Sequence, residues 1–481
     1  MVANVVQLTE QKKQIQQLNR SFTAQQEGFR RNRMPSMTER RENLRRLKRL
    51  LLENQDALTA AIDRDFSGRS RDETLLAELM PSVQGINYAL KNLSQWMKPS
   101  RRHVSLLFMP GSNKVHYEPL GVVGVMVPWN YPLFLAMSPL TAALSAGNRV
   151  MLKLSEFTPH TSALIKELLE ANFPEDLVTV INGEMDVSQA FASKPFDHLL
   201  FTGSTAVGKH VMRAAAEHLT PVTLELGGKS PALISADVPM KDAAERIAFG
   251  KAFNAGQTCV APDYVLCPAD RVNHFVDAFR DAIARMYPTM KENPDYTSII
   301  NERQHARLNA LLDDARKKGA EIVTINPANE HFAEGTRKMP IHLVLNASDD
   351  MDLMQEEIFG PIMPVLPYGG VDEALEFINE RPRPLAMYYF GYDKSAQKYI
   401  MENSHSGGMS INDTLMHVAQ DDMPFGGLGA SGMGHYHGEE GFRTLSNARG
   451  VYAKQRLNSG RFVHPPHGTL IHKLVFKLFI R

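Results

Sequence analysis

Five short apolar runs between residues 122 and 226 restrict the fold of this chain more than any other feature. Each run is five or six residues long, and a segment long enough to cross back over a sheet separates it from the next. The runs are 122–127, 149–154, 177–181, 198–202 and 222–226. Nearly continuous Val, Leu and Ile are expected in strands whose two faces are both covered by helices. The pattern predicts a doubly wound α/β fold with a parallel sheet and with ligands bound beyond the carboxyl ends of its strands.

The residues before this sheet predict helices and a projecting arm. Residues 1–98 have helical apolar spacing, with a helix expected from Thr9 and a capping box at Ser36-Met-Thr-Glu39. Extended runs at 104–109 and 114–117 flank a turn-forming Pro-Gly-Ser-Asn segment. This combination predicts a hairpin arm of the kind that often serves contacts between subunits.

The residues after the sheet repeat the alternation of strands and helices less regularly. Strands are expected at 320–325 and 342–345, within a second α/β unit. A chain of 481 residues also exceeds what one hydrophobic core usually covers, so two or three domains are expected. We expect a dinucleotide-binding domain made of residues 1–103 and 120–226, and a catalytic domain made of residues 227–423. Residues 104–119 and 424–460 are expected to be oligomerisation or bridging segments, and residues 461–481 to be a C-terminal tail.

Composition excludes several classes of protein and partner. Fifty-three basic residues balance 53 acidic ones, so the chain lacks the net positive field of a dedicated nucleic-acid binder. Its two cysteines indicate a reducing cytoplasm, and its first twenty residues hold no apolar run that could be a signal peptide or a membrane span. His435 and His437 have no further ligands at metal-binding spacing, so no metal site is expected.

A glycine-containing loop at Gly203-Ser-Thr-Ala-Val-Gly-Lys-His210 follows one apolar run and opens a helix. This context lets backbone N–H groups hold phosphate. The loop nearly matches the P-loop of nucleotide hydrolases, but His210 stands where that motif needs a magnesium-binding hydroxyl. A dinucleotide pyrophosphate fits better, and a simple tight turn is the alternative. A second glycine cluster, 427–432, follows no strand and is interpreted as a turn.

Cys259 is the candidate nucleophile. It follows Gly256-Gln-Thr in a polar stretch that predicts a loop, and Gly256 allows close approach of the backbone. Cys267 lies in an apolar strand-like run and is interpreted as an inert core residue. A lone cysteine is usually such a core residue, so Cys259 on its own does not establish a catalytic site.

Six motifs, in this order and spacing, resemble the NAD(P)-dependent aldehyde dehydrogenase superfamily across residues 36–455. They are Pro128-Trp-Asn-Tyr-Pro132, Phe201-Thr-Gly-Ser204, Leu224-Glu-Leu-Gly-Gly-Lys-Ser-Pro231, Gly256-Gln-Thr-Cys259, Gln355-Glu-Glu-Ile-Phe-Gly-Pro361 and Pro424-Phe-Gly-Gly427. The segments 218–225 and 259–264 are similar to the class 3 branch, which includes fatty-aldehyde, benzaldehyde-type and bacterial coniferyl aldehyde dehydrogenases. The resemblance implies oxidation of an aldehyde to its acid, with coniferyl aldehyde as the best single expectation and medium or long aliphatic aldehydes next.

The resemblance also implies roles for individual residues. Cys259 would attack the aldehyde as a thiolate, Asn130 would donate to the resulting oxyanion, and Glu225 would activate water to hydrolyse the thioester. Glu357 is the second candidate for the base. Tyr131, Thr258 and Val260 are expected to line the substrate pocket. The implied cofactor-binding residues are Val127, Pro128, Trp129, Lys153, Glu156, Gly183, Gly203, Ser204, Val207, Leu226, Glu357 and Phe359.

The implied cofactor is NAD, with NADP possible as well. Glu156 at the adenosine ribose would repel the 2′-phosphate of NADP, while Lys153 offsets part of that repulsion. Two other classes stay open on the residues alone: a P-loop nucleotide hydrolase, and a catalytically silent protein that binds a membrane or serves a structural role. Cofactor-dependent turnover separates the expected enzyme from both.

The C-terminal segment 470–481 is amphipathic, with Lys473, Lys477 and Arg481 on one helical line. Twelve helical residues span roughly 18 Å, which is less than the roughly 30 Å of a bilayer core. The segment can therefore dock across a homodimer, the favoured interpretation, or lie at the inner face of a membrane as a peripheral anchor.

Overall fold

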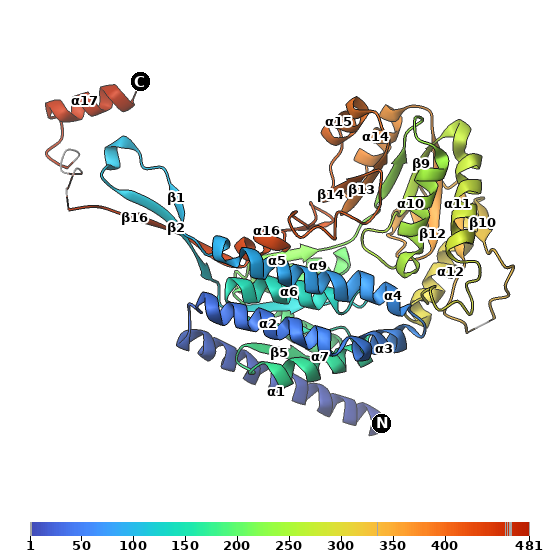
Figure 1. Cartoon of the computed structure of the whole chain (residues 1–481), viewed down its shortest axis with the longest axis horizontal. Coiled ribbons are helices and arrows are strands. Elements are labelled where there is room, and N and C mark those ends of the chain that lie inside the picture. The colour runs from blue at the N-terminus through green and yellow to red at the C-terminus, as the bar shows by residue number, and fades with distance from the viewer. Residues whose placement is uncertain (1, 334, 457, 459, 461–463, 481) are drawn as a thin grey trace.

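The protein is described here by a computed structural model that covers residues 2–333, 335–456, 458, 460 and 464–480. Two α/β units with mostly parallel sheets form the body, each sheet carrying one antiparallel edge strand, and a thin arm projects from the body toward the C-terminal helix (Figure 1). One continuous core runs through both units, from Leu44 and Leu93 of the N-terminal helices through Val123 to Val265 and Tyr388 of the second sheet. Packing therefore fixes one unit against the other.

The first sheet confirms the predicted doubly wound order. Its strands are β3 (Val122–Met126), β4 (Arg149–Lys153), β5 (Val178–Ile181), β6 (His198–Thr202) and β7 (Val222–Glu225). They lie in the order β7-β6-β3-β4-β5 and all pair in parallel. The crossovers are α6 (Phe134–Ala146), α7 (Pro159–Asn172), α8 (Met185–Ala192) and α9 (Thr205–Ala216). A short strand from the distant glycine cluster, β15 (Gly432–Met433), pairs antiparallel with β7.

The N-terminal helices pack over this sheet. They are α1 (Val2–Arg31), α2 (Met37–Glu53), α3 (Gln55–Phe66), α4 (Arg71–Thr74), a π-turn η1 (Leu75–Leu79) and α5 (Met80–Trp96). The expected helix start at Thr9 is wrong, because α1 begins at Val2 and nothing in the sequence before Thr9 breaks a helix. The capping box is confirmed, since Ser36 Oγ accepts from the Glu39 amide and Glu39 accepts from the Ser36 amide.

The second sheet lies beyond Gly227 in the order β10-β11-β12-β9-β8-β13-β14. Its strands are β8 (Pro231–Ile234), β9 (Tyr264–Pro268), β10 (Glu321–Ile325), β11 (Ile341–Leu345), β12 (Ile362–Tyr368), β13 (Ala386–Phe390) and β14 (Gly408–Ile411). Its helices are α10 (Met240–Ala252), α11 (Val272–Met286), α12 (Glu302–Lys317), α13 (Asp352–Gln355), α14 (Val371–Asn379) and α15 (Lys394–Glu402). Both strands expected from the sequence are present. The domain bounds given above stay predictions.

The arm differs from the expected hairpin. Its strands are β1 (Ser100–Arg102), β2 (Ser112–Pro119) and β16 (Ser446–Ala453), and β2 lies between the other two. The expected strand at 104–109 is wrong: these residues form a 3₁₀ turn, η2 (Leu106–Phe108), in which the Phe108 amide donates to the Ser105 carbonyl. The long partner of β2 is β16, more than 300 residues away in the chain, and short-range pattern cannot reveal such a pairing.

The chain ends in α16 (Gly438–Thr444), β16 and α17 (Leu470–Phe479), and α17 lies away from the body (Figure 1). The amphipathic helix is confirmed, and a capping box of Thr469 and His472 starts it. Arg481, the last member of the predicted basic line, lies outside the described residues. Within the described part of the chain, no helix is both long enough and apolar enough to span a membrane.

Candidate active site

The carboxyl edge of the first sheet gathers most of the predicted cofactor-binding residues. Val127, Pro128 and Trp129 follow β3, and Lys153 ends β4. Gly183 follows β5, Gly203 and Ser204 follow β6, and Leu226 follows β7. Since parallel strands end at one edge, side chains that are up to 100 residues apart in the chain meet there. Glu357 and Phe359 come from the second unit, and the Phe359 ring lies edge-on to Trp129 with 5.3 Å between centroids.

The loop after β6 has the local structure of an anion-binding turn. Ser204 is the N-cap of α9, and its hydroxyl accepts from the Val207 amide at 3.4 Å. Val207 itself is 47% exposed, so an apolar side chain faces outward beside the loop. Gly208 is needed inside the helix because a Cβ there would lie 2.7 Å from the Leu226 side chain. The glycine therefore lets α9 pack directly on the end of β7.

Lys153 and Glu156 form a second polar pair at this edge. The Lys153 ammonium is buried, donates to the Leu154 carbonyl at 2.7 Å and lies 3.4 Å from the Glu156 carboxylate. Burial lowers the pKa of Lys153, and Glu156 opposes that shift. The Glu156 side chain is 38% exposed. It is therefore open to an incoming hydroxyl group while Lys153 anchors it.

Cys259 lies on a tight loop between the two units. After α10 the chain enters left-handed backbone at Asn254, Ala255 and Gly256. A Cβ on Gly256 would lie 2.4 Å from the Gly360 carbonyl oxygen, which confirms the close approach expected there. Cys259 is partly exposed, whereas Cys267 is fully buried in β9, as predicted. Only Cys259 is open to a substrate.

Asn130 faces this loop. Its side-chain Nδ2 donates to the backbone carbonyl of Gln257 at 3.2 Å. The backbone carbonyl of Asn130 accepts from Asn254 Nδ2 at 3.1 Å. A primary amide carries two N–H donors. One N–H of Asn130 is thus held by the cysteine loop, and among the described residues no acceptor for the other is seen, which leaves it for a ligand oxygen.

Two carboxyl groups lie close to the thiol. Glu225 is 2% exposed, and neither of its oxygens has a hydrogen-bond partner among the described residues. Burial therefore raises its pKa well above the ordinary value of 4.5. Burial, and the nearby Asp263, raise the pKa of Glu357 to about 8. Burial together with Glu357 and Glu225 raises the pKa of the Cys259 thiol to about 12.

Gly227 leaves room for the Glu357 carboxylate. A Cβ on Gly227 would lie 2.0 Å from Glu357 Oε2, so any side chain there would displace the carboxylate. Gly228 has a φ of +145°, which L side chains rarely adopt. Glycine is therefore required at position 227 by the space that Glu357 occupies, and at position 228 by the backbone conformation.

An apolar pocket opens onto Cys259 and encloses about 1110 Å³ of empty space, its mouth included. The predicted residues Tyr131, Thr258 and Val260 all line it, and the Tyr131 and Thr258 hydroxyls share a hydrogen bond of 2.7 Å. Sequence reasoning missed most of the wall. The missed residues are Leu76, Ala77, Met80, Pro81, Gln84, Phe134, Leu135, Phe249, Phe253, Leu415, Met416, Val418, Ala419, Phe425 and Tyr436. They come from distant segments, and apart from Phe425, which lies in the Pro424-Phe-Gly-Gly427 motif, none belongs to a motif quoted above.

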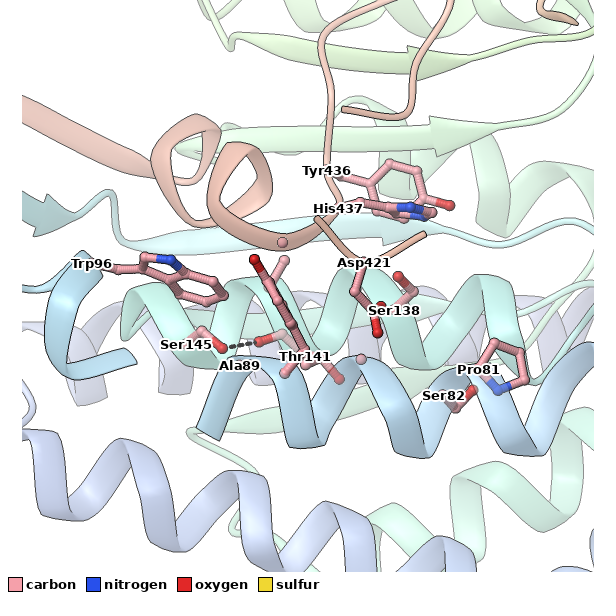
Figure 2. A pocket seen from close by; sticks show the side chains of 14 residues that line it. Pro81, Ser82, Ala89, Trp96, Ser138, Thr141, Ser145, Asp421, Tyr436 and His437 are labelled. Atoms are coloured by element: carbon pink, nitrogen blue, oxygen red, sulfur yellow. Dashed lines mark hydrogen bonds between the residues drawn. The ribbon is translucent and has the colours of Figure 1, made fainter. Parts of the chain in front are cut away.

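A smaller, more polar cavity lies behind this wall, between α5, α6 and the segment before α16 (Figure 2). Ser82, Ser138, Thr141 and Ser145 contribute hydroxyl groups to it, and Tyr436 lines both cavities. The Ser145 hydroxyl donates to the Thr141 carbonyl at 2.6 Å. The hydroxyls give this cavity a different chemistry from the apolar pocket at Cys259.

Comparison with known proteins decides the family. The model of the aldehyde dehydrogenase family matches residues 3–451. The chain is 60% identical to a probable coniferyl aldehyde dehydrogenase of Pseudomonas aeruginosa, over all of both chains. It is 46% identical to a coniferyl aldehyde dehydrogenase of Pseudomonas sp. strain HR199, over 89% of each. The solved substrate-bound AldH of Staphylococcus aureus superposes with a TM-score of 0.91 at 36% identity, over 96% of this chain and 99% of that one.

The chain belongs to the aldehyde dehydrogenase family. It is therefore an NAD(P)-dependent oxidoreductase that converts an aldehyde to its acid, and the predicted α/β fold is confirmed. Membership also removes the two alternatives that the residues had left open, the P-loop hydrolase and the silent binding protein. Among the described residues, no cluster of three or more His, Cys, Asp or Glu side chains could hold a metal ion.

The edge of this aldehyde dehydrogenase fits the cofactor that the family uses. Glu357 Oε1 is buried and has no hydrogen-bond partner in the part of the chain that the structure describes, which suits an acceptor for ribose hydroxyls. The exposed Val207 offers an apolar surface to an adenine ring, and Gly203 carries no side chain that could obstruct the approach of phosphate. The donors and acceptors at this edge thus match a dinucleotide rather than a free phosphate.

Proposed function

We propose that this aldehyde dehydrogenase oxidises an aromatic aldehyde of the coniferyl type through a cysteine thioester, with Cys259 as nucleophile, Asn130 as oxyanion donor and Glu225 as base. Three observations support this most directly: the partly exposed Cys259 thiol lines the apolar pocket, Asn130 Nδ2 binds the loop that carries this thiol, and the charges of the buried Glu225 and Glu357 act on it. The same proposal assigns the cofactor to the residues at the carboxyl edge of the first sheet.

The first step forms a bond between Cys259 Sγ and the aldehyde carbon. Because the pKa of the thiol in the protein alone is about 12, its proton must pass to a neighbouring group as the bond forms. Of the two carboxylates whose charges act on this thiol, Glu357 has the larger effect and takes this proton, which leaves Glu225 ionised for the hydrolytic step. The oxyanion of the thiohemiacetal then accepts from Asn130 Nδ2 and from the Cys259 amide.

Hydrolysis of the thioester completes the reaction. When bound, NAD(P) supplies the hydride acceptor, and the carbon attached to Cys259 is left at the oxidation level of an acid. Glu225 then takes a proton from water, the hydroxide adds to the thioester carbon, and the thiolate leaves. A buried carboxyl group with a raised pKa is a stronger base than an exposed one, which suits this step. Glu357 remains the second candidate.

The Cys259→Ser variant should lose more than 99% of wild-type turnover, because a serine hydroxyl does not ionise readily enough to replace the thiol. Steady-state NADH formation measures the loss, and cofactor affinity should stay near the wild-type value. Cys267→Ser is the matched control and should keep most of the activity, since Cys267 is buried in β9. The reverse pattern would show that the wrong sulfur has been chosen.

The Glu225→Gln variant should still release one equivalent of NADH in a burst and then stall as the thioester, because the base is needed only after hydride transfer. In the wild type, the hydrolytic rate should rise with pH through a midpoint well above 4.5, since burial raises the pKa of Glu225 and only its ionised form is a base. Stopped-flow traces between pH 5 and pH 9 measure both effects. A variant without a burst would shift the base assignment to Glu357 or give Glu225 a role in both steps.

The pocket supports an aromatic substrate. Its wall contains the rings of Phe134, Phe249, Phe253, Phe425 and Tyr436 and has no charged side chain. Aromatic side chains favour flat apolar ligands in offset or edge-to-face contact. The two relatives named above point to coniferyl aldehyde in particular. A long aliphatic aldehyde is the second candidate, because the same wall accepts any apolar chain.

A screen of purified enzyme should give the highest kcat/KM with coniferyl aldehyde, and a lower value with benzaldehyde and with aliphatic aldehydes of six to sixteen carbons. NAD should be preferred over NADP, because the exposed Glu156 carboxylate opposes a 2′-phosphate. Initial rates of NADH and NADPH formation across the panel measure both preferences. A clear maximum at a long aliphatic aldehyde would replace the aromatic assignment.

The arm and the tail support a homodimer, while the two unpaired cysteines agree with the reducing cytoplasm expected from the sequence. Leu106, Phe108 and Met109 on the arm are each at least half exposed, as are Leu474 and Leu478 on α17. Contiguous exposed apolar groups mark interaction surfaces. The edge strand of the arm is β16, and α17 comes after it in the chain. A second copy of the chain can therefore cover the apolar residues of the arm and those of α17 in one symmetric contact. Peripheral attachment of α17 to a membrane is the alternative.

Light scattering should therefore give twice the mass of one chain for the wild type, and a larger monomer fraction for Leu474→Glu at micromolar concentration. The charge would have to be desolvated in the contact, whereas it is tolerated at a free surface. Lys473→Glu is the control on the basic line of the same helix. A monomeric wild type that cosediments with anionic vesicles would favour the membrane role.

A further inference from the structure

Arg69 is a fully buried arginine in the short connection between α3 and α4. Its guanidinium carbon lies 4.9 Å from the ring centroids of both Phe66 and Tyr131. Its nitrogens lie 3.1 Å from Glu78 Oε1 and 3.6 Å from Glu73 Oε1. A charge so far from water is costly unless paired, and here two carboxylates and two aromatic faces surround it.

The guanidinium contacts the backbone of the proposed oxyanion donor. Arg69 NH1 donates to the Asn130 carbonyl at 3.0 Å. That oxygen also accepts from Asn254 Nδ2 at 3.1 Å, so two donors hold the peptide that follows Asn130. This backbone carbonyl and the Asn130 side chain belong to the same residue. Holding the carbonyl in place therefore also fixes the position from which the side-chain amide extends to the Cys259 loop.

The two carboxylates connect Arg69 to the segments on either side of the site. Glu78 Oε2 accepts from the amides of Leu133 at 2.7 Å and Phe134 at 3.1 Å, in the segment that carries Asn130. Glu73 Oε1 accepts from the Asn254 amide at 3.1 Å, in the loop that carries Cys259. Glu78 thus holds the Asn130 segment, Glu73 holds the Cys259 loop, and Arg69 is the ion partner of both carboxylates.

Burial of this cluster opposes its ionisation. Burial raises the pKa of Glu73 and of Glu78, and Arg69 lowers both. Buried ion pairs contribute little net stability compared with apolar packing, yet they fix geometry, because a displaced charge loses its partners. Electrostatic stabilisation of an oxyanion depends on donors that are already in place before the reaction.

We propose that Arg69 is a positioning residue of the oxyanion site: it holds the Asn130 segment against the Cys259 loop and does not itself touch the substrate. The proposal rests on the proposed roles of Asn130 and Cys259. It predicts that loss of the guanidinium slows the formation and oxidation of the thiohemiacetal and leaves cofactor binding unchanged.

The Arg69→Lys variant tests this. Lysine keeps the positive charge but lacks the planar fork that reaches the Asn130 carbonyl and both carboxylates together. The rate constant of the NADH burst should fall about 10- to 100-fold, as expected for a misplaced catalytic group. The aldehyde KM and the NAD dissociation constant should stay within about threefold of wild type, a range well below the expected catalytic loss.

Two further variants separate positioning from general stability. Arg40→Lys is the matched control: Arg40 is also buried and donates to the Ser145 and Ala146 carbonyls at the end of α6. It should lower the unfolding temperature without slowing the burst. Asn130→Ala should slow the burst about 10²- to 10³-fold, and adding Arg69→Lys should then slow it by less than about threefold, because the two residues act through one donor.

Each outcome is decisive. A wild-type burst rate in Arg69→Lys, or full additivity with Asn130→Ala, would overturn the positioning role and leave the proposed function intact. An unaffected burst in Asn130→Ala would overturn the oxyanion assignment and the inference with it. Should Arg69→Lys not fold, Arg69→Met combined with Glu78→Gln preserves the net charge of the cluster and should show the same loss of burst rate with unchanged NAD affinity.

Discussion

Burial of acidic groups around one thiol is the constraint on which this site depends. Glu225 has no hydrogen-bond partner among the described residues, Glu357 lies against the α-carbon of Gly227, and both raise the pKa of Cys259. A polar group left without a partner in the folded chain loses hydration and gains nothing in return. The fold tolerates this because both sheets meet in one continuous core. In the proposed mechanism, these groups exchange protons with the substrate and with water.

The surrounding network of polar contacts explains how the site keeps its shape. The Asn130 segment and the Cys259 loop come from different α/β units, yet Arg69, Glu73 and Glu78 bind both. Glu78 lies in the π-turn η1. Leu76 and Ala77 of the same turn, together with Met80 directly after it, line the apolar pocket. Single π-turns inside helices often occur at functional sites because the extra residue redirects side chains. Here one irregular turn supplies both an anchor for the site and part of the pocket wall.

Much of the fold and of the site was predictable because the relevant signals are local. The five strands of the first sheet lie within a residue or two of the expected bounds, and the capping box at Ser36 forms as its spacing requires. Most of the residues predicted to bind the cofactor lie within five residues of the ends of these strands, whereas Glu357 and Phe359 come from the second unit. Where the structure differs, long-range contacts decide. The 104–109 segment turns instead of extending, and the partner of β2 is the distant β16.

The sequence by itself determined the alternation of strands and helices in the first sheet and the residues that end its strands, and its motifs predicted which groups react, since each signal depends on consecutive residues. Only the tertiary structure decided that Glu357 lies on Gly227, that Tyr436 lines two cavities, and that the buried Arg69 connects the two sides of the site. The physical reason is that pKa shifts, pocket walls and buried ion pairs depend on which distant segments exclude water together, and spacing along the chain carries no information about that exclusion.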